Sequence, residues 1–178
     1  MAGSRIARRA VAIAAAAACL VLGGACGSPP RAADQSPLRW TFDSPEAVAA
    51  AVLDALAAND VEQLEALALS ETEFRTVVWP ELPSSRPERG LPFEYAWGDL
   101  HQKSNNALRR LIAREAGRRY HLLAVEFDGE STTYETYTVH RDSRLLIRGE
   151  DGAEEQVRLF GSILERGGEF KLFSYVVD

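Results

Sequence analysis

The chain has 178 residues, 46% of them hydrophobic and 26% charged, and its formal net charge is −6 at pH 7. Binding to the phosphates of nucleic acids needs clustered Lys and Arg, so this acidic balance argues against a nucleic acid partner. Without its first 25 residues the chain has the size of one domain, which buries roughly two-thirds of its unfolded surface.

Residues 1–25 have the pattern of an export signal. Arg5, Arg8 and Arg9 precede an apolar run from Ala10 to Leu22, which ends in small residues. A spanning helix needs about 20 apolar residues, so this run is too short for a retained anchor. Removal of the segment leaves 17 basic and 26 acidic residues, a formal charge of −9.

Cys26 follows three small residues and opens a segment rich in Pro and Ser. This pattern resembles the lipobox of bacterial lipoproteins, with Gly23 in place of the usual Leu. The resemblance implies that Cys26 carries acyl chains, which hold the exported protein at a membrane of the bacterial cell envelope. Gly27, rather than Asp, follows the cysteine, which resembles lipoproteins sorted to the outer membrane in cells that have two.

Two alternatives stay open. The first is cleavage before Cys19, which also follows small residues, but this cleavage would leave the apolar Leu20–Leu22 exposed. The second is an ordinary secreted protein in which Cys26 is incidental and carries no lipid. With Cys26 acylated and Cys19 removed, the mature domain has no thiol for a disulfide or a zinc site. We expect no cofactor. Residues 26–39 are predicted to be the lipidated cysteine and a flexible tether, and residues 40–178 a single domain.

Helical signals begin at Ser44, which suits an N-cap, and Pro45, which suits the first helical position. One apolar face follows at helical spacing and consists of Val48, Val52, Leu53 and Leu56. Capping-box spacing recurs in the pairs Asp60–Gln63 and Ser70–Glu73. The pattern predicts three short helices in series before Pro80.

Residues 79–100 read WPELPSSRPERGLPFEYAWGDL and hold four prolines among their aromatic residues. Because so many rings are costly to leave in water together, we expect an ordered segment. Three interpretations stay open: a lid over a pocket, a docking surface for a ligand or partner, and a cap that completes the core. For the first two, the candidate binding residues are Trp79, Tyr95 and Trp97.

A long helix is predicted next, with Gly117 placed to end it, from residues at helical spacing: Trp97, Leu100, Ser104, Ala107, Leu108, Leu111 and Ile112. From Tyr120 onward the runs YHLLAVEF, STTYETYTVH, RLLIR, EQVRLFGSILE and EFKLFSYVVD predict strands. Turn residues predict hairpins at Asp128-Gly129, Asp151-Gly152 and Gly167-Gly168. Helices followed by a curved antiparallel meander make an α+β fold.

This order of elements resembles the nuclear transport factor 2-like superfamily, which includes ketosteroid-isomerase-like and SnoaL-like domains. The likeness is carried by SPEAVAAAVLDALAANDVEQLEALA at residues 44–68 and GSILERGGEFKLFSYVVD at residues 161–178. It spans about residues 41–178 and implies a bent sheet that wraps the helices into a cone. The long segment 79–100 departs from the family pattern. The superfamily hosts enzymes, binders and interaction modules, so the fold does not decide the function.

The sequence offers few polar residues as candidates for catalysis or ligand binding. His101 follows Asp99 by two residues, and the pair is either an acid–base dyad at the mouth of the cone or a solvated helical turn. Tyr134 and His140 share one strand face, which either lines the cone, as ligand contacts, or faces solvent. Glu126, Glu135 and Ser162 match no catalytic motif, and the chain has no H-E-x-x-H, P-loop or G-x-S-x-G sequence.

The leading hypothesis is a membrane-anchored envelope lipoprotein that binds a small apolar ligand or a protein partner without catalysis. The alternative is a small-molecule isomerase or hydrolase-like enzyme that uses the cone as its active site. A deep cavity with a buried carboxylate near Tyr or His favours the enzyme, whereas a filled cone beside exposed aromatic residues favours the binder.

Overall fold

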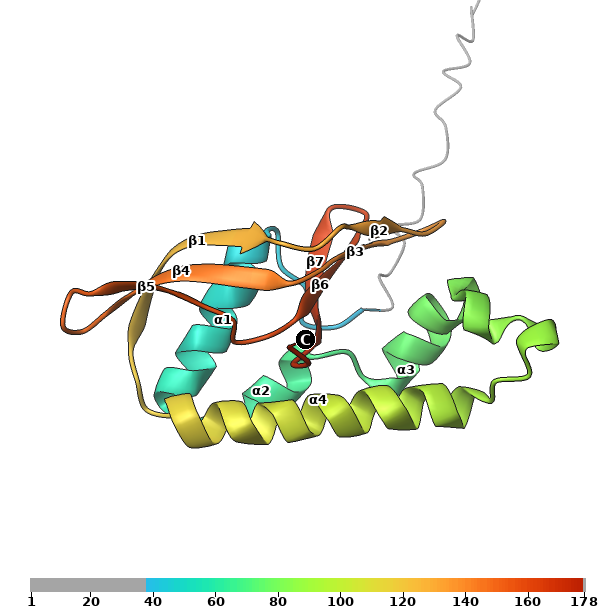
Figure 1. Ribbon diagram of the computed structural model, residues 1–178, viewed down its shortest axis with the longest axis horizontal. Helices are drawn as coiled ribbons and strands as arrows, with labels where there is room; N and C mark the ends of the chain where they lie inside the picture. Colours follow the sequence, from blue (N-terminus) through green and yellow to red (C-terminus); the bar gives the residue numbers. More distant parts are fainter. Residues whose placement is uncertain (1–37, 178) are drawn as a thin grey trace, which may run out of the picture. The chain divides into compact units, whose positions relative to one another are not determined.

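The computed structural model describes residues 38–177, so the predicted signal peptide, Cys26 and the tether up to residue 37 lie outside the described residues. The described residues form one compact unit. Helices come first along this unit and antiparallel strands follow, which confirms the predicted α+β class (Figure 1). Both hydrophobic cores described below are made from residues of this unit, so we expect it to fold without residues 1–35.

The first helices begin where the caps predict. In α1 (Pro45–Ala58) the Ser44 Oγ accepts a hydrogen bond of 3.1 Å from the Ala47 N–H, and Asn59 ends the helix with a left-handed φ of 52°. Asp60 caps α2 (Val61–Leu67) in the same way. A complete capping box starts α3 (Glu71–Glu73), which continues as the π-helical turn η1 (Phe74–Val78).

The Pro-rich segment forms three short 3-10 turns: η2 (Trp79–Glu81), η3 (Pro83–Ser85) and η4 (Pro87–Arg89). Each turn has one proline at its first or second position. Because proline has no N–H to donate, the repeated prolines prevent these turns from joining into one α-helix. Gly90, with a φ of 61°, ends the series. The long helix α4 (Phe93–Glu115) begins four residues before Trp97, because the buried Phe93 belongs to its first turn.

The strands make two antiparallel sheets: β1 (Tyr120–Phe127), β2 (Thr132–Thr133), β3 (Thr138–His140), β4 (Ser143–Gly149), β5 (Glu154–Val157), β6 (Ser162–Arg166) and β7 (Glu169–Ser174). Their orders are β1-β4-β5 and β2-β3-β6-β7. The turns predicted at Asp151-Gly152 and Gly167-Gly168 are confirmed, because they join the paired strands β4–β5 and β6–β7.

The hairpin predicted at Asp128-Gly129 is wrong. The Asp128 N–H donates to the Asp142 carbonyl at 3.1 Å and the Gly129 N–H to the Arg141 carbonyl at 3.3 Å, so pairing continues from β1–β4 into β2–β3. The chain reverses instead at residues 134–137. A side chain at position 129 would collide with Asp142, so this glycine permits close approach of two strands rather than a turn.

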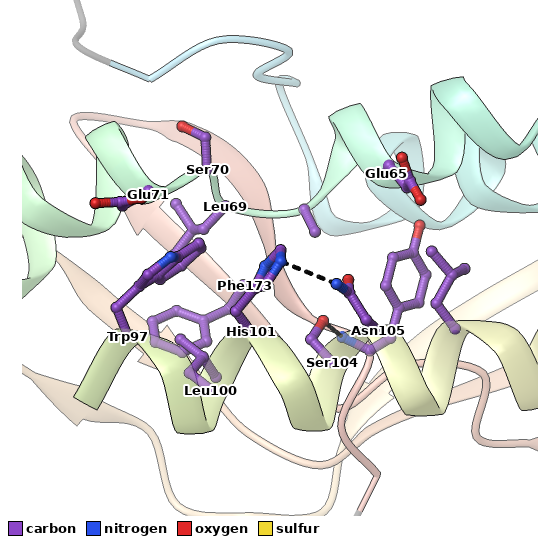
Figure 2. A pocket seen from close by; sticks show the side chains of 13 residues that line it. Glu65, Leu69, Ser70, Glu71, Trp97, Leu100, His101, Ser104, Asn105 and Phe173 are labelled. Carbon is purple, nitrogen blue, oxygen red and sulfur yellow. Dashed lines mark hydrogen bonds between the residues drawn. The ribbon is translucent and has the colours of Figure 1, made fainter. Parts of the chain in front are cut away.

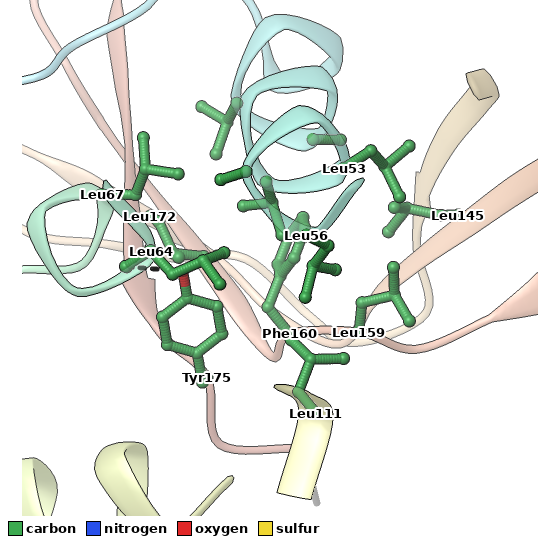
Figure 3. Packing of buried hydrophobic residues seen from close by; sticks show 14 of the residues in the cluster. Leu53, Leu56, Leu64, Leu67, Leu111, Leu145, Leu159, Phe160, Leu172 and Tyr175 are labelled. Carbon is green, nitrogen blue, oxygen red and sulfur yellow. Dashed lines mark hydrogen bonds between the residues drawn. The ribbon is translucent and has the colours of Figure 1, made fainter. Parts of the chain in front are cut away.

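The larger core lies between α1, α2, the second half of α4 and the sheets (Figure 3). Its fully buried side chains include Leu56, Phe160 and Tyr175. The Tyr175 hydroxyl donates a 2.6 Å hydrogen bond to the Leu64 carbonyl, which satisfies the polar end of a buried ring. Burial raises the pKa of Tyr175, so its hydroxyl remains a proton donor.

A second core joins residues 79–100, here called the aromatic segment, to β3 and β6. Its buried residues are Leu38, Leu69, Phe74, Val77, Val78, Phe93, Tyr137, Val139 and Leu164. The buried Tyr137 hydroxyl donates to the Val78 carbonyl at 3.2 Å. The Glu81 carboxylate accepts a 3.1 Å hydrogen bond from the Thr136 N–H. The aromatic segment is therefore fastened to the turn between β2 and β3, and Phe74 and Phe93 complete the core beneath it.

A buried ion pair connects β7 with the first described residues. Lys171 Nζ lies 3.6 Å from Glu73 Oε1, and the two side chains are 1% and 4% exposed. Lys171 also donates to the Arg39 carbonyl at 2.7 Å and to the Ala66 carbonyl at 3.3 Å. Glu73 accepts from the Arg39 N–H at 2.6 Å. Both backbone polar groups of Arg39 are thus held by one buried pair.

Candidate functional site

The main candidate site is a groove of about 470 Å³ between α4 and the segment from Glu65 to Glu71, here called the α2–α4 groove. Trp97, Leu100, His101, Ser104 and Asn105 come from α4, and Phe173 lies at the back from β7 (Figure 2). Positions three and four apart on a helix share a face, so the helical spacing of these residues brings them to one wall.

Trp97 and His101 form the aromatic part of the wall. Their rings stack with centroids 5.0 Å apart, and the other neighbour of the Trp97 ring is Phe74 at 5.5 Å. The His101 ring therefore covers one flat face of the indole, and the apolar side chains Leu100, Leu108 and Phe173 also line the groove.

Asn105 fixes the orientation of the imidazole. Its Nδ2 lies 2.9 Å from His101 Nε2. An amide nitrogen only donates, so Nε2 is the accepting nitrogen and the neutral ring carries its proton on Nδ1. Of the two interpretations of Asp99 and His101, the structure does not form the acid–base dyad, because Asp99 pairs with Lys103 at 2.7 Å and lines a different cavity.

That second cavity, of about 390 Å³, lies between α4 and the strands β3, β6 and β7. Its lining combines the stacked rings of Tyr134 and Tyr137, 4.6 Å apart, with charges of opposite sign. The charged side chains are Asp99, Lys103, Arg141 and Asp142. Leu100 and Phe173 line both cavities, so they separate the two spaces.

The predicted binding residues do not form one site. Trp97 lines the α2–α4 groove and Tyr134 the second cavity, whereas Trp79, Tyr95 and His140 line neither. Trp79 packs edge-on against Phe93 with ring centroids 5.7 Å apart. Tyr95 is 66% exposed on α4.

His140 of β3 is held in a row of three side chains, between Ser131, which directly precedes β2, and Glu165 of β6. Its Nδ1 lies 2.9 Å from the Ser131 Oγ, and its Nε2 lies 2.8 Å from Glu165 Oε2. The ring is also in contact with Phe127, at a centroid distance of 5.0 Å. A hydroxyl, an imidazole and a carboxylate in this order are the parts of a proton relay, but none of the three lines either cavity.

Sequence reasoning missed the other wall of the groove, which comes from Glu65, Leu69 and Ser70. Their approach to α4 depends on tertiary packing, and no local pattern marks it. Asn105 could have been predicted as a partner of His101, because it lies one helical turn beyond His101 on a helix that the sequence predicts. Ser131 and Glu165 depend on the strand register, which was predicted incorrectly at Asp128-Gly129.

Comparison with protein-family models, curated proteins and solved structures finds no match for this chain. Within residues 38–177, no group of three or more His, Cys, Asp or Glu side chains is arranged to hold a metal ion. No helix of that part of the chain is long and apolar enough to cross a membrane.

Proposed function

We propose that this chain is an exported lipoprotein, anchored in the bacterial envelope through Cys26, whose domain binds a small, largely apolar ligand in the α2–α4 groove without chemical conversion. The observation that carries the proposal is the groove itself. Its volume of about 470 Å³ falls in the range of small-molecule sites, which are about 300–1,000 Å³. Seven apolar or aromatic side chains and six polar ones line it, and small-molecule sites combine apolar side chains with polar groups that fix the orientation of the ligand.

The proposal includes a fold like that of the nuclear transport factor 2-like superfamily. Continuous pairing through Asp128 and Gly129 supports it, because β1 and β2 then act as one long bent strand that returns as β3 and β4. Bent strands of this kind close a sheet around helices. Helix α1 lies between these strands and α4, and the large core of Figure 3 surrounds it.

Binding is tested by filling the groove. In Asn105→Phe a ring replaces a groove-lining amide, so we expect the dissociation constant for octanol, used as an apolar probe and measured by calorimetry on residues 36–178, to rise at least about tenfold. Asn106→Phe is the matched control, because the neighbouring Asn106 is exposed and does not line the groove. Equal octanol binding by the two variants would contradict the proposed site.

The anchor is tested separately by mass spectrometry of the protein extracted from cell membranes. We expect a mature chain that begins at Cys26 and carries acyl chains on it. A chain that begins elsewhere, or an unmodified Cys26, would remove the lipoprotein part of the proposal and leave the groove unaffected.

The alternative, a hydrolase-like enzyme, is favoured by one observation, the row Ser131–His140–Glu165 with distances of 2.9 and 2.8 Å. A relay of this kind activates the hydroxyl for attack. Covalent labelling of Ser131 by a fluorophosphonate, lost in His140→Ala, would support the enzyme. We expect no labelling, because the exposed Ser131 lines neither cavity in which a substrate would be held.

A further inference from the structure

We propose that the α2–α4 groove selects ligands whose polar head is a cationic amine and discriminates against ligands with an anionic head. This inference rests on the proposed function and adds the chemical class of the ligand. The charged side chains that line the groove are Glu65 and Glu71, and neither Lys nor Arg contributes to its lining among the described residues (Figure 2).

Glu65 carries the stronger part of the argument. It belongs to α2 on the wall opposite α4, and within residues 38–177 it makes no ion pair. Glu65 and Tyr175 line the same groove, and after burial the charge of Glu65 is the second cause that raises the pKa of Tyr175. An ammonium group placed in the groove would therefore meet a carboxylate that nothing else neutralises.

Glu71 and Asn105 add further acceptors. Glu71 Oε1 accepts from Arg75 at 2.9 Å, and its second oxygen makes no hydrogen bond to the described residues. Asn105 bonds to His101 through its amide nitrogen and also lines the groove, and its amide oxygen is a further acceptor. The other donors in the lining, such as the indole N–H of Trp97 and the second amide hydrogen of Asn105, are uncharged and do not offset the two carboxylates.

The two serines do not change this balance. The Ser70 hydroxyl donates to Glu73 at 2.8 Å, and the Ser104 Oγ accepts from the Tyr175 N–H at 3.1 Å. The carboxylates of Glu65 and Glu71 thus give the lining a negative charge that no Lys or Arg of the described lining balances, which suits a cation. The second cavity, in which Lys103 and Arg141 stand beside Asp99 and Asp142, has no comparable bias.

The experiment compares three probes that share one apolar chain and differ in the charge of the head: octylamine, octanol and octanoate. Calorimetry on residues 36–178 at about pH 8 keeps the amine cationic and the acid anionic. We expect octylamine to bind roughly tenfold more tightly than octanoate, with octanol between them. In the double variant Glu65→Gln with Glu71→Gln, this ratio should fall toward one.

Glu62→Gln is the matched control, because Glu62 is exposed on the same helix α2 and does not line the groove. It should keep the preference for the amine. Equal or tighter binding of octanoate, or a preference that survives the double substitution, would overturn the charge selectivity and leave the proposed function standing. Failure of all three probes to bind would overturn both.

Discussion

Replacing Glu73 by alanine is expected to lower the free energy of unfolding by about 3–5 kcal/mol, because it leaves the charge of Lys171 buried without its partner. The expectation follows from the burial of both side chains, which are 4% and 1% exposed, and from the loss of three hydrogen bonds to the Glu73 carboxylate from Arg39 and Ser70. Urea denaturation followed by circular dichroism measures the loss.

An exposed ion pair provides the control. Arg148 and Glu154 lie 2.6 Å apart, but about half of each side chain is exposed, so Glu154→Ala should cost less than about 1 kcal/mol. If Glu73→Ala and Glu154→Ala lower the free energy of unfolding by the same small amount, Lys171 is not held as the structure shows.

The same pair gives the stability a defined pH dependence. Burial lowers the pKa of Lys171, and the nearby Glu73 carboxylate partly raises it again. In Glu73→Gln the raising effect is lost, so the folded state releases the proton of Lys171 more easily than the unfolded state does. The unfolded chain then binds more protons, and stability rises with pH. The deficit of Glu73→Gln should therefore be smaller at about pH 10 than at about pH 7.

Replacing Phe74 by alanine should cost about 3–5 kcal/mol, the usual loss for a buried aromatic side chain. Phe74 is 3% exposed, and its ring touches Trp79, Phe93 and Trp97 at centroid distances of 5.5–6.4 Å. It is the common neighbour of these three rings, so its loss opens the second core at its centre. Thermal unfolding measures the change.

Two less buried aromatic residues provide controls for the stability loss of Phe74→Ala. Trp97 is only partly buried at the wall of the groove, so Trp97→Ala should cost about 1–2 kcal/mol. Tyr95 is 66% exposed, and Tyr95→Ala should change stability by less than about 0.5 kcal/mol. Equal losses for Phe74→Ala and Tyr95→Ala would mean that the segment does not pack as described.

Local signals in the sequence predicted the helical half well. Ser44, Asp60 and Ser70 cap the helices at the predicted positions, because capping depends on hydrogen bonds within three residues. Gly152 and Gly168 mark turns for a similar local reason, a positive φ that side chains disfavour. The same local reasoning wrongly predicted a turn at Gly129. This glycine instead permits close contact with Asp142, which is far from it in the sequence.

The site was less predictable than the fold. Trp97 and His101 are on a predicted helix, but Glu65 and Leu69 reach them only through the packing of α2 against α4. The row around His140 depends on which strands pair and in what register. The pairing of Lys171 with Glu73 joins residues 98 positions apart in the sequence, and no periodicity connects them.

The most direct test of a ligand site in the α2–α4 groove is chemical-shift mapping of backbone amides in residues 36–178 during titration with octanol. Binding in the groove predicts that the largest shifts occur on both walls, in residues 65–71 and 97–108. Shifts confined to residues 134–142, around the second cavity, or an absence of shifts at saturating octanol, would contradict the proposed function.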